Sequence, residues 1–237
     1  DELTSKKGNR NVVQNRFFTK TGRFELAPVL GIVPNNPFVK RYVGGTLIAY
    51  HFSEVIAMEG AFMYSPDLGG QDLKALTHTL VNIAEEGSGE VNFQQPLDKM
   101  IMGATFAARW APVYGKINLI GERVLNFDFY GTAGIGMLAV NKYYASYDSA
   151  SETGTSIPDQ PVEKKTEVPI NLGVGLDFFF SNSLALKIDA RDYFYVDEKP
   201  QYDPDTPQTE KRLYNNFIAS VGFGVYFPKM QERRYDF

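Results

Sequence analysis

Residues 168–180 read VPINLGVGLDFFF, and this stretch decides the fold. Every second position is apolar, from Val168 to Phe180, while the positions between them carry mainly Asn, Gly and Asp. Because successive side chains of a β-strand point to opposite faces, the pattern predicts a strand with one apolar face and one face of small or polar residues.

The same alternation returns in residues 125–139 and 217–227. A soluble β-sandwich also alternates, but its second face is solvated and typically carries Lys, Glu and Thr. Here the second face is rich in Gly, with a few charges placed in the middle of strands. Small residues toward a narrow lumen and an apolar stripe toward lipid fit a small transmembrane barrel better than a sandwich.

The composition agrees with strands in a membrane and excludes several other classes. Aromatic residues make up 14% of the 237 residues, 21 residues are Gly, and the mean hydropathy is −0.26. No run of 18 apolar residues is present, so a spanning chain must form a closed barrel that satisfies its own backbone groups. The net charge of −4 offers no basic field for nucleic acid. The lack of Cys excludes a disulfide scaffold and a thiolate site.

Eight segments carry the strand pattern, and most are about ten residues or longer, the length that a tilted membrane-spanning strand needs. We therefore predict an all-β protein, a transmembrane antiparallel up-and-down β-barrel of eight strands. A turn region at residues 112–122 leaves ten strands open as an alternative, because it is either a longer excursion or an extension of its flanking strands. The eight segments are residues 23–33, 38–52, 55–64, 99–113, 123–140, 167–180, 183–196 and 213–227.

The connections alternate between short and long, as in outer-membrane barrels with short periplasmic turns and long outward loops. We expect a periplasmic N-terminal segment at residues 1–22, one barrel at 23–228 and a periplasmic tail at 229–237. Both of these terminal segments are expected to be solvated. The long cell-surface loops are expected at residues 65–98, 141–166 and 197–212.

One segment of the second outer loop reads as a helix. Between Gln71 and Glu85, Leu73, Leu76 and Leu80 recur at helical spacing. The pattern predicts a short amphipathic helix that packs on the loop, lies over the barrel mouth or lies at the membrane surface.

Several charges fall on the face that alternation turns toward the lumen. A charge facing lipid would cost about 2–4 kcal/mol at mid-bilayer, and an eight-stranded barrel has little room for water inside. These side chains are therefore expected to pair with one another as a plug of salt bridges; a polar pore or a proton-transfer site is the alternative. Asp192 breaks the pattern, because strict alternation turns it toward lipid unless it lies above the hydrocarbon or a bulge re-aims it. The predicted lumen residues are Glu25, Glu59, Arg109, Asp128, Asp177, Lys187, Asp189 and Arg191.

Candidates for catalysis are few. His51 and His78 are the two histidines, and the strand assignment places them on opposite sides of the membrane, so they cannot form one site. A rim-located hydrolase would need a serine such as Ser65 or Ser88 close to His78. No phosphate-binding loop or zinc-ligand spacing is present. We therefore expect no enzyme, no cofactor and no metal site.

The last strand carries a second kind of candidate signal. Its alternating apolar residues end in an aromatic residue, which resembles the signal that the barrel-assembly machinery reads. These residues are Phe217, Val221, Phe223, Val225 and Phe227.

A set of short motifs, in order along residues 12–228, is similar to one protein family. The motifs are GRFELAP at 22–28, NPF at 36–38, AYHFSE at 49–54, PVYGK at 112–116, FD at 127–128 and GIG at 134–136. Together they resemble the outer-membrane β-barrel domain family of myxobacteria, predatory bacteria and their relatives. Some members of that family belong to gliding-motility machinery, so the resemblance implies a structural or partner-binding barrel and brings no catalytic residues.

These observations lead to a first hypothesis of function. We expect a non-enzymatic outer-membrane barrel of the small OmpA-like or porin-like kind in a Gram-negative bacterium, acting as an anchor or docking subunit. A narrow pore for small solutes or ions is the alternative, and a rim-located lipid or peptide hydrolase is the third. The expected partners are outer-membrane lipid, the barrel-assembly machinery and other envelope proteins, bound through the periplasmic termini or outer loops. No nucleic acid is expected.

Overall fold

The computed structural model describes residues 18–68, 73–77, 79, 93–118, 124–147, 163–201 and 208–229. These residues form one antiparallel sheet of nine strands. The strands are β1 (Arg23–Val33), β2 (Arg41–His51), β3 (Ile56–Tyr64), β4 (Phe93–Asn118), β5 (Val124–Tyr147), β6 (Glu163–Glu167), β7 (Ile170–Phe179), β8 (Leu184–Gln201) and β9 (Gln208–Phe227).

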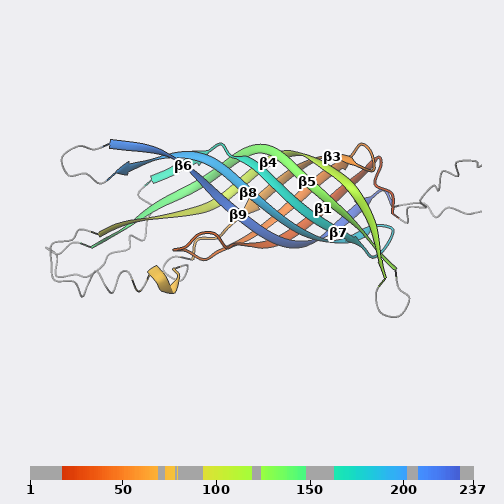
Figure 1. Cartoon of the computed structure of the whole chain (residues 1–237), viewed down its shortest axis with the longest axis horizontal. Coiled ribbons are helices and arrows are strands. Elements are labelled where there is room, and N and C mark those ends of the chain that lie inside the picture. Colours follow the sequence, from red (N-terminus) through yellow and green to blue (C-terminus); the bar gives the residue numbers. More distant parts are fainter. Residues whose placement is uncertain are drawn as a thin grey trace, which may run out of the picture.

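The sheet closes on itself. Successive strands pair from β1 to β5 and from β7 to β9, β5 pairs with both β6 and β7, and β9 pairs back to β1 (Figure 1). β6 and β7 share one place in the ring, because both pair with β5 in a single register, with Glu167 opposite Leu138 and Ile170 opposite Ile135. Only Val168 and Pro169 separate them, and proline has no N–H for the ladder. The described residues therefore form a closed barrel with eight strand positions, as predicted, and not ten.

Four strands are longer than the sequence pattern indicated. The β4–β5 hairpin continues in paired register to Asn118 and Val124, so residues 112–122 extend the two flanking strands. At the other end of the barrel the same hairpin stays paired to Phe93 and Tyr147, and β8–β9 to Gln201 and Gln208. The predicted loops at 65–98, 141–166 and 197–212 are too long for this reason. The β8 and β9 extensions, DEKPQ at 197–201 and QTEKR at 208–212, are rich in charged residues and do not alternate as the strands do elsewhere.

The two ends of the barrel differ. β1 begins and β9 ends at one of them, which we call the terminal end; the opposite one is the loop end (Figure 1). β1, β2 and β3 have 11, 11 and 9 residues, the length of one membrane crossing. β4, β5, β8 and β9 have 26, 24, 18 and 20 residues, so they project beyond that band.

The outer surface of the barrel is apolar. Along β1 and β7, inward residues are buried and the residues between them are largely exposed. Leu30 is 72% exposed, Ile135 63% and Phe106 56%. A closed barrel with an exposed apolar belt and charges inside satisfies its backbone in lipid and places its apolar surface against acyl chains. The chain is therefore a membrane-spanning β-barrel. No helix among the described residues is long and apolar enough to cross a membrane.

Two inward glycines make room for large lumen side chains. A Cβ on Gly175 would meet the ring of Tyr130, and one on Gly173 would lie 2.7 Å from the Arg191 side chain. The glycines on the inward face of these strands thus leave the space that larger lumen side chains fill. Gly22 has a different role: its φ of 73° lies in the left-handed region, where the chain turns into β1.

Among the described residues of the predicted helix segment, 75–77 and 79 are helical. This segment lies beside the loop between β1 and β2, because Thr77 Oγ1 and the Lys74 backbone N–H both donate to the Phe38 carbonyl. Leu73 is buried there and bridges to Val39. The rest of the predicted helix, including His78, lies outside the described residues.

Candidate functional site

The eight lumen residues predicted from the sequence all face the interior. They come from β1, β3, β4, β5, β7 and β8, and none is more than 3% exposed. Alternation brings them there because each occupies the same phase as its inward neighbours on the strand. Together with Lys20, His51 and Tyr130, described below, they form what we call the charged layer.

Arg109 on β4 lies at the centre of the charged layer. Its Nη1 is 2.8 Å from Oε2 of Glu25, and its Nη2 pairs with Oδ2 of Asp177. The guanidinium also lies over the ring of Tyr130, 3.6 Å from the ring centroid. One cation thus joins carboxylates from β1 and β7, the arrangement that a buried charge requires.

Lys187 closes the same group from β8. Its Nζ is 2.8 Å from Oε1 of Glu25 and 2.9 Å from Oδ1 of Asp177. Glu25 and Asp177 therefore each contact both Arg109 and Lys187. This sharing of partners makes a network that spans the barrel.

Arg191 and Asp189 extend the network toward the loop end. Arg191 Nε donates to Oδ1 of Asp189 at 2.6 Å, and its Nη1 is 2.5 Å from Oε1 of Glu59. The Tyr130 hydroxyl donates to Oδ2 of Asp189 at 2.7 Å. Asp189, Glu59 and Tyr130 thereby connect to the group around Arg109.

Three members of the charged layer were not among the predicted lumen residues. Tyr130 and His51 occupy inward positions on β5 and β2, and Nε2 of His51 is 3.0 Å from Oε2 of Glu25. A wider use of alternation, with uncharged polar residues included, finds both. Lys20 pairs with Asp128 but precedes the first strand, so no strand pattern points to it.

The terminal end of the lumen is closed by an aromatic plug of Phe18, Phe179, Ala185 and Tyr226. Phe18 stacks on Phe179 with ring centroids 4.1 Å apart and meets Tyr226 edge-on at 4.8 Å. Arg23 covers the plug, with its guanidinium 4.8 Å from the Phe18 ring.

The sequence led us to expect a solvated segment before β1. This prediction was wrong for Phe18 and Lys20, which are buried. Phe18 is 1% exposed and Lys20 2%. Glu54, in the turn between β2 and β3, accepts the backbone N–H groups of Lys20 and Thr21 and the Thr21 hydroxyl at 2.7–3.1 Å. This segment enters the barrel because an aromatic ring and a lysine both find buried partners there.

An apolar layer lies above the charged layer. It consists of Val33, Val43, Met63, Met100, Leu138, Val140, Tyr193, Tyr195 and Ile218. The inward residues of β8 give the order of the layers along the lumen: Ala185 belongs to the aromatic plug, Lys187 and Arg191 to the charged layer, and Tyr193 to the apolar layer.

A second ion cluster caps the loop end beyond the apolar layer. Oδ1 of Asp197 accepts hydrogen bonds from Lys142 at 2.9 Å and from Lys165 at 2.6 Å. Burial raises the pKa of the Asp197 carboxyl, but these two hydrogen bonds outweigh it and hold the pKa below its usual value. Asp197 thereby joins β5, β6 and β8 where the wall projects beyond the membrane.

Little free space remains among these layers. A pocket between the charged and apolar layers, bounded by Arg191, Tyr193 and Ser220, has a volume of about 10 Å³. That is about the room that one water molecule needs. Between the charged and apolar layers, the side chains that border this pocket therefore leave room for about one water molecule.

The catalytic candidates do not come together in the described residues. His51 is buried against Glu25 at the terminal end. Ser65 is buried and donates its hydroxyl to the Tyr42 carbonyl at 2.7 Å. His78 and Ser88 lie outside the described residues. No group of three or more potential metal-ligating side chains occurs in the part of the chain that the structure describes.

The residues of the proposed assembly signal lie on the outer face of β9. Val221, Phe223, Val225 and Phe227 are 38–55% exposed, and Phe217 is half-buried. They belong to the apolar belt. Asp192 also lies on the outer face, since β8 keeps an unbroken register with both neighbours and no bulge re-aims it.

Comparisons with known proteins bear on the overall shape. No protein-family model matches the chain, and no curated protein matches it. Three solved structures have a similar fold at 11–12% sequence identity. They are the N-terminal β-barrel domain of Pseudomonas aeruginosa OprF (TM-score 0.45, 87% of this chain and 98% of that one), the outer membrane protein OprG of Pseudomonas aeruginosa (0.47, 88% and 97%) and Ail, the attachment invasion locus protein of Yersinia pestis (0.42, 87% and 99%).

Proposed function

We propose that the chain is a closed, non-conducting barrel of the bacterial outer membrane that anchors or docks other envelope components without acting as an enzyme. The observation that carries this proposal is the filled lumen. An aromatic plug, a charged layer and an apolar layer follow one another along it, and the pocket between the last two holds about 10 Å³. Such an interior favours a rigid transmembrane anchor over a pore.

The charged layer supports a structural role in particular. A pore needs charges that face water, whereas Arg109, Lys187 and Arg191 each contact two or more carboxylates at 0–3% exposure. Through these contacts Arg109 joins β4 to β1 and β7, Lys187 joins β8 to β1 and β7, and Arg191 joins β8 to β3. The cost of desolvation is offset only when the partners stay in place, so the layer resists opening.

The direction of docking follows from the strand lengths. We place the terminal end in the periplasm and the loop end outside, because short turns lie on the periplasmic side of outer-membrane barrels. Phe18 and Lys20 lie inside the terminal end, 1% and 2% exposed. Envelope partners would then be met either at that end or on the paired strand extensions of β4–β5 and β8–β9 at the loop end.

Single-channel recording in planar bilayers tests the closed lumen. The folded full chain is expected to give no steady openings, because ions would have to cross the apolar layer. A matched variant, Leu138→Gly with Met63→Gly, removes two side chains of that layer and is expected to raise the leak current. Steady openings in the unaltered chain, abolished by a lumen-blocking substitution, would overturn the proposal in favour of a narrow pore.

Crosslinking in intact cells tests the docking role. Proteins that co-purify with the full chain after crosslinking are expected to be lost when residues 1–16 are deleted or when the projecting hairpins are shortened. Deletion of residues 1–16 keeps Phe18 and Lys20, so the barrel itself remains closed. An unchanged set of co-purified proteins in both variants would count against docking.

A further inference from the structure

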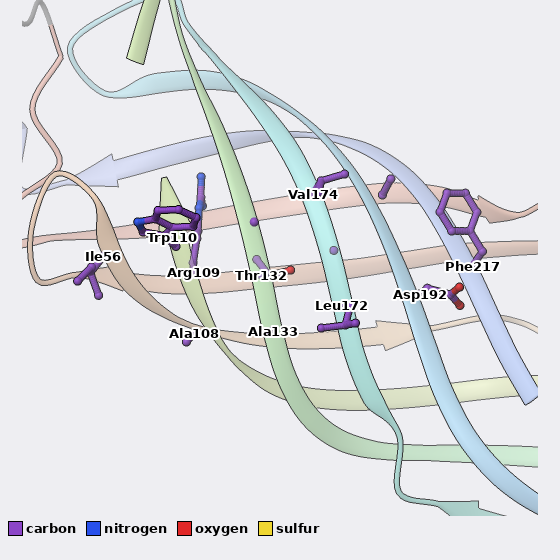
Figure 2. Close-up of a pocket in the computed structure, with 13 residues that line it drawn as sticks. Ile56, Ala108, Arg109, Trp110, Thr132, Ala133, Leu172, Val174, Asp192 and Phe217 are labelled. Atoms are coloured by element: carbon purple, nitrogen blue, oxygen red, sulfur yellow. The ribbon is translucent and has the colours of Figure 1, made fainter. Parts of the chain in front are cut away.

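β9 has one side without a neighbouring strand where it extends beyond β1 at the loop end. Its pairing with β8 continues to Gln208, whereas its pairing with β1 ends at Ala219. The unpaired stretch starts at Phe217, which lies opposite Asp192 of β8 on the outer face of the barrel (Figure 2). We call the side of residues 208–217 that faces away from β8 the β9 edge.

The side chain of Asn35 covers the first part of the β9 edge. Its Nδ2 donates to the Asn215 carbonyl and its Oδ1 accepts the Phe217 N–H, both at 3.0 Å. Because the backbone groups of a strand alternate between its two sides, those of Leu213 and Lys211 point to the same side as these two. Among the described residues, neither backbone has a hydrogen-bond partner there. The two residues therefore offer free N–H and C=O groups in the spacing of a β-ladder.

Two other extended strands are protected against such pairing. The Asp98 carbonyl of β4 accepts a side-chain amide of the β1–β2 loop on its free side, so Pro96, two residues away, has no N–H to offer there. On β8, the Glu198 N–H donates to Oδ1 of Asp197 at 2.8 Å, and Pro200 follows two residues later. Proline and side-chain caps are common protections of exposed strand edges. The β9 edge contains no proline.

A second copy in the same membrane does not fit the β9 edge. Two copies insert in the same direction, so their β9 strands run the same way, each tilted by about 35–45° from the barrel axis. Two-fold symmetry about the membrane normal makes these strands cross at about 70–90°. Neighbouring strands of a sheet differ by only about 20–25°. The β9 edge therefore fits an extended segment of another protein better than a second barrel.

The side chains along the free backbone groups define the chemistry of that segment. Lys211 and Leu213 are 73% and 69% exposed on the outer face. Arg212 is exposed on the other face, where Tyr214 is half-buried. Cross-strand pairs of opposite charge and of apolar residues stabilise a sheet. Acidic residues opposite the two cations and apolar residues opposite Leu213 and Tyr214 therefore complement this stretch.

We propose that the β9 edge binds an extended segment of a partner protein, with adjacent apolar and acidic residues, as an additional antiparallel strand. This inference rests on the docking function proposed above, and it names the docking surface and the chemistry of the partner. Hydrogen bonds to the backbones of Lys211 and Leu213 supply affinity, and the side chains on both faces select the segment.

Fluorescence anisotropy with labelled peptides tests this pairing on the folded full chain in lipid nanodiscs. The probe is acetyl-TVVEET-amide, whose two valines lie opposite Tyr214 and Leu213 in antiparallel register and whose two glutamates lie opposite Arg212 and Lys211. We expect saturable binding. The same peptide with N-methyl groups on the second valine and the second glutamate cannot donate to the edge and should bind about tenfold more weakly. The charge-reversed acetyl-TVVKKT-amide should also bind about tenfold more weakly.

Two variants of one residue separate backbone pairing from side-chain contact. Leu213→Pro removes an N–H that points away from β8, a position where edge strands tolerate proline, so it is expected to fold and to abolish binding of acetyl-TVVEET-amide. Leu213→Ala is the matched control, because it keeps the N–H, and it should weaken binding only about two- to fivefold. Lys211→Glu should remove the preference for the acidic peptide over the basic one.

Several results would overturn the proposal: no saturable binding of any peptide, equal binding of the N-methylated peptide, equal behaviour of Leu213→Pro and Leu213→Ala, or an unchanged preference in Lys211→Glu. Efficient disulfide dimerisation of Leu213→Cys in vesicles would also overturn it, since the chain has no other Cys and a second copy would then occupy the edge. Failure of peptide binding, with crosslinked proteins that still depend on residues 1–16, would refute this inference alone and leave the docking function standing.

Discussion

The charged layer and the apolar layer fill neighbouring parts of one lumen by opposite means. In the charged layer, cations share carboxylates, as Arg109 and Lys187 do at Glu25. In the apolar layer, side chains such as Leu138 and Ile218 pack without any charge. The same strand, β8, contributes to both. The way in which the lumen is filled therefore changes from one layer to the next along a single strand.

The largest expected effect comes from breaking the charged layer. Replacing Arg109 with Met leaves Glu25 and Asp177 short of a buried partner, and removing one member of a buried ion pair costs about 3–5 kcal/mol. Urea unfolding in detergent or lipid vesicles measures the loss of unfolding free energy. Lys211→Met, in an exposed pair with Glu198, is the control and is expected to change it by less than about 0.5 kcal/mol. Equal losses in both variants would show that the network contributes no stability.

Most of the barrel could be predicted from the sequence, because alternation decides which face each residue takes. β1 matches its predicted bounds, and all eight predicted lumen charges face inward. The charges could be recognised because a charge toward lipid is costly, which leaves one face open to them.

The apolar layer could not be recognised in the same way. The inward residues Leu138 and Val140 alternate with the outward residues Met137 and Ala139, so both faces of β5 are apolar there. Lys20 and Phe18 were missed for another reason: they lie before β1, where no strand period applies. β4, β5, β8 and β9 were predicted too short at the loop end, because the apolar alternation that marks a lipid-facing strand does not continue there.

The apolar layer offers the next test of the comparison. Leu138 is fully buried, and Leu138→Ala is expected to cost about 2–4 kcal/mol through the cavity that it leaves. Leu30→Ala is the control, since Leu30 is 72% exposed on the lipid face, where acyl chains fill the space. Unfolding free energies of the two variants in one lipid decide the matter. A larger loss for Leu30 would place the apolar packing outside the barrel instead of inside.

The aromatic plug should show a smaller, local effect. Ala185 is fully buried in it, and the chain has no Cys, so Ala185→Cys gives a single label site. Adding Phe18→Ala removes two ring contacts worth about 1 kcal/mol each, which should speed maleimide labelling about tenfold or more. Phe24→Ala, on the outer face, should leave the labelling rate unchanged. Unchanged labelling in the Phe18 variant would mean that Phe18 does not close the lumen.

The smallest expected effect is the pH dependence of the loop-end cluster. Hydrogen bonds from Lys142 and Lys165 hold the pKa of Asp197 below its usual value, despite the opposing effect of burial. Its contribution is therefore present above the unfolded-state pKa and is lost as the pH falls through the lower, folded-state pKa. Asp197→Asn should remove up to about 1 kcal/mol near neutral pH and nothing in strong acid. Unfolding curves at several pH values measure this, and a deficit that grew on acidification would contradict it.

The most direct test of the central claim uses the single tryptophan. Trp110 is 62% exposed on the outer face of β4, where the account places acyl chains. In reconstituted vesicles, its fluorescence is expected to be quenched strongly by phospholipids with brominated acyl chains and weakly by acrylamide in the aqueous phase. Strong quenching by acrylamide with none by the brominated lipids, together with a folded monomer in detergent-free buffer, would contradict a membrane-spanning barrel.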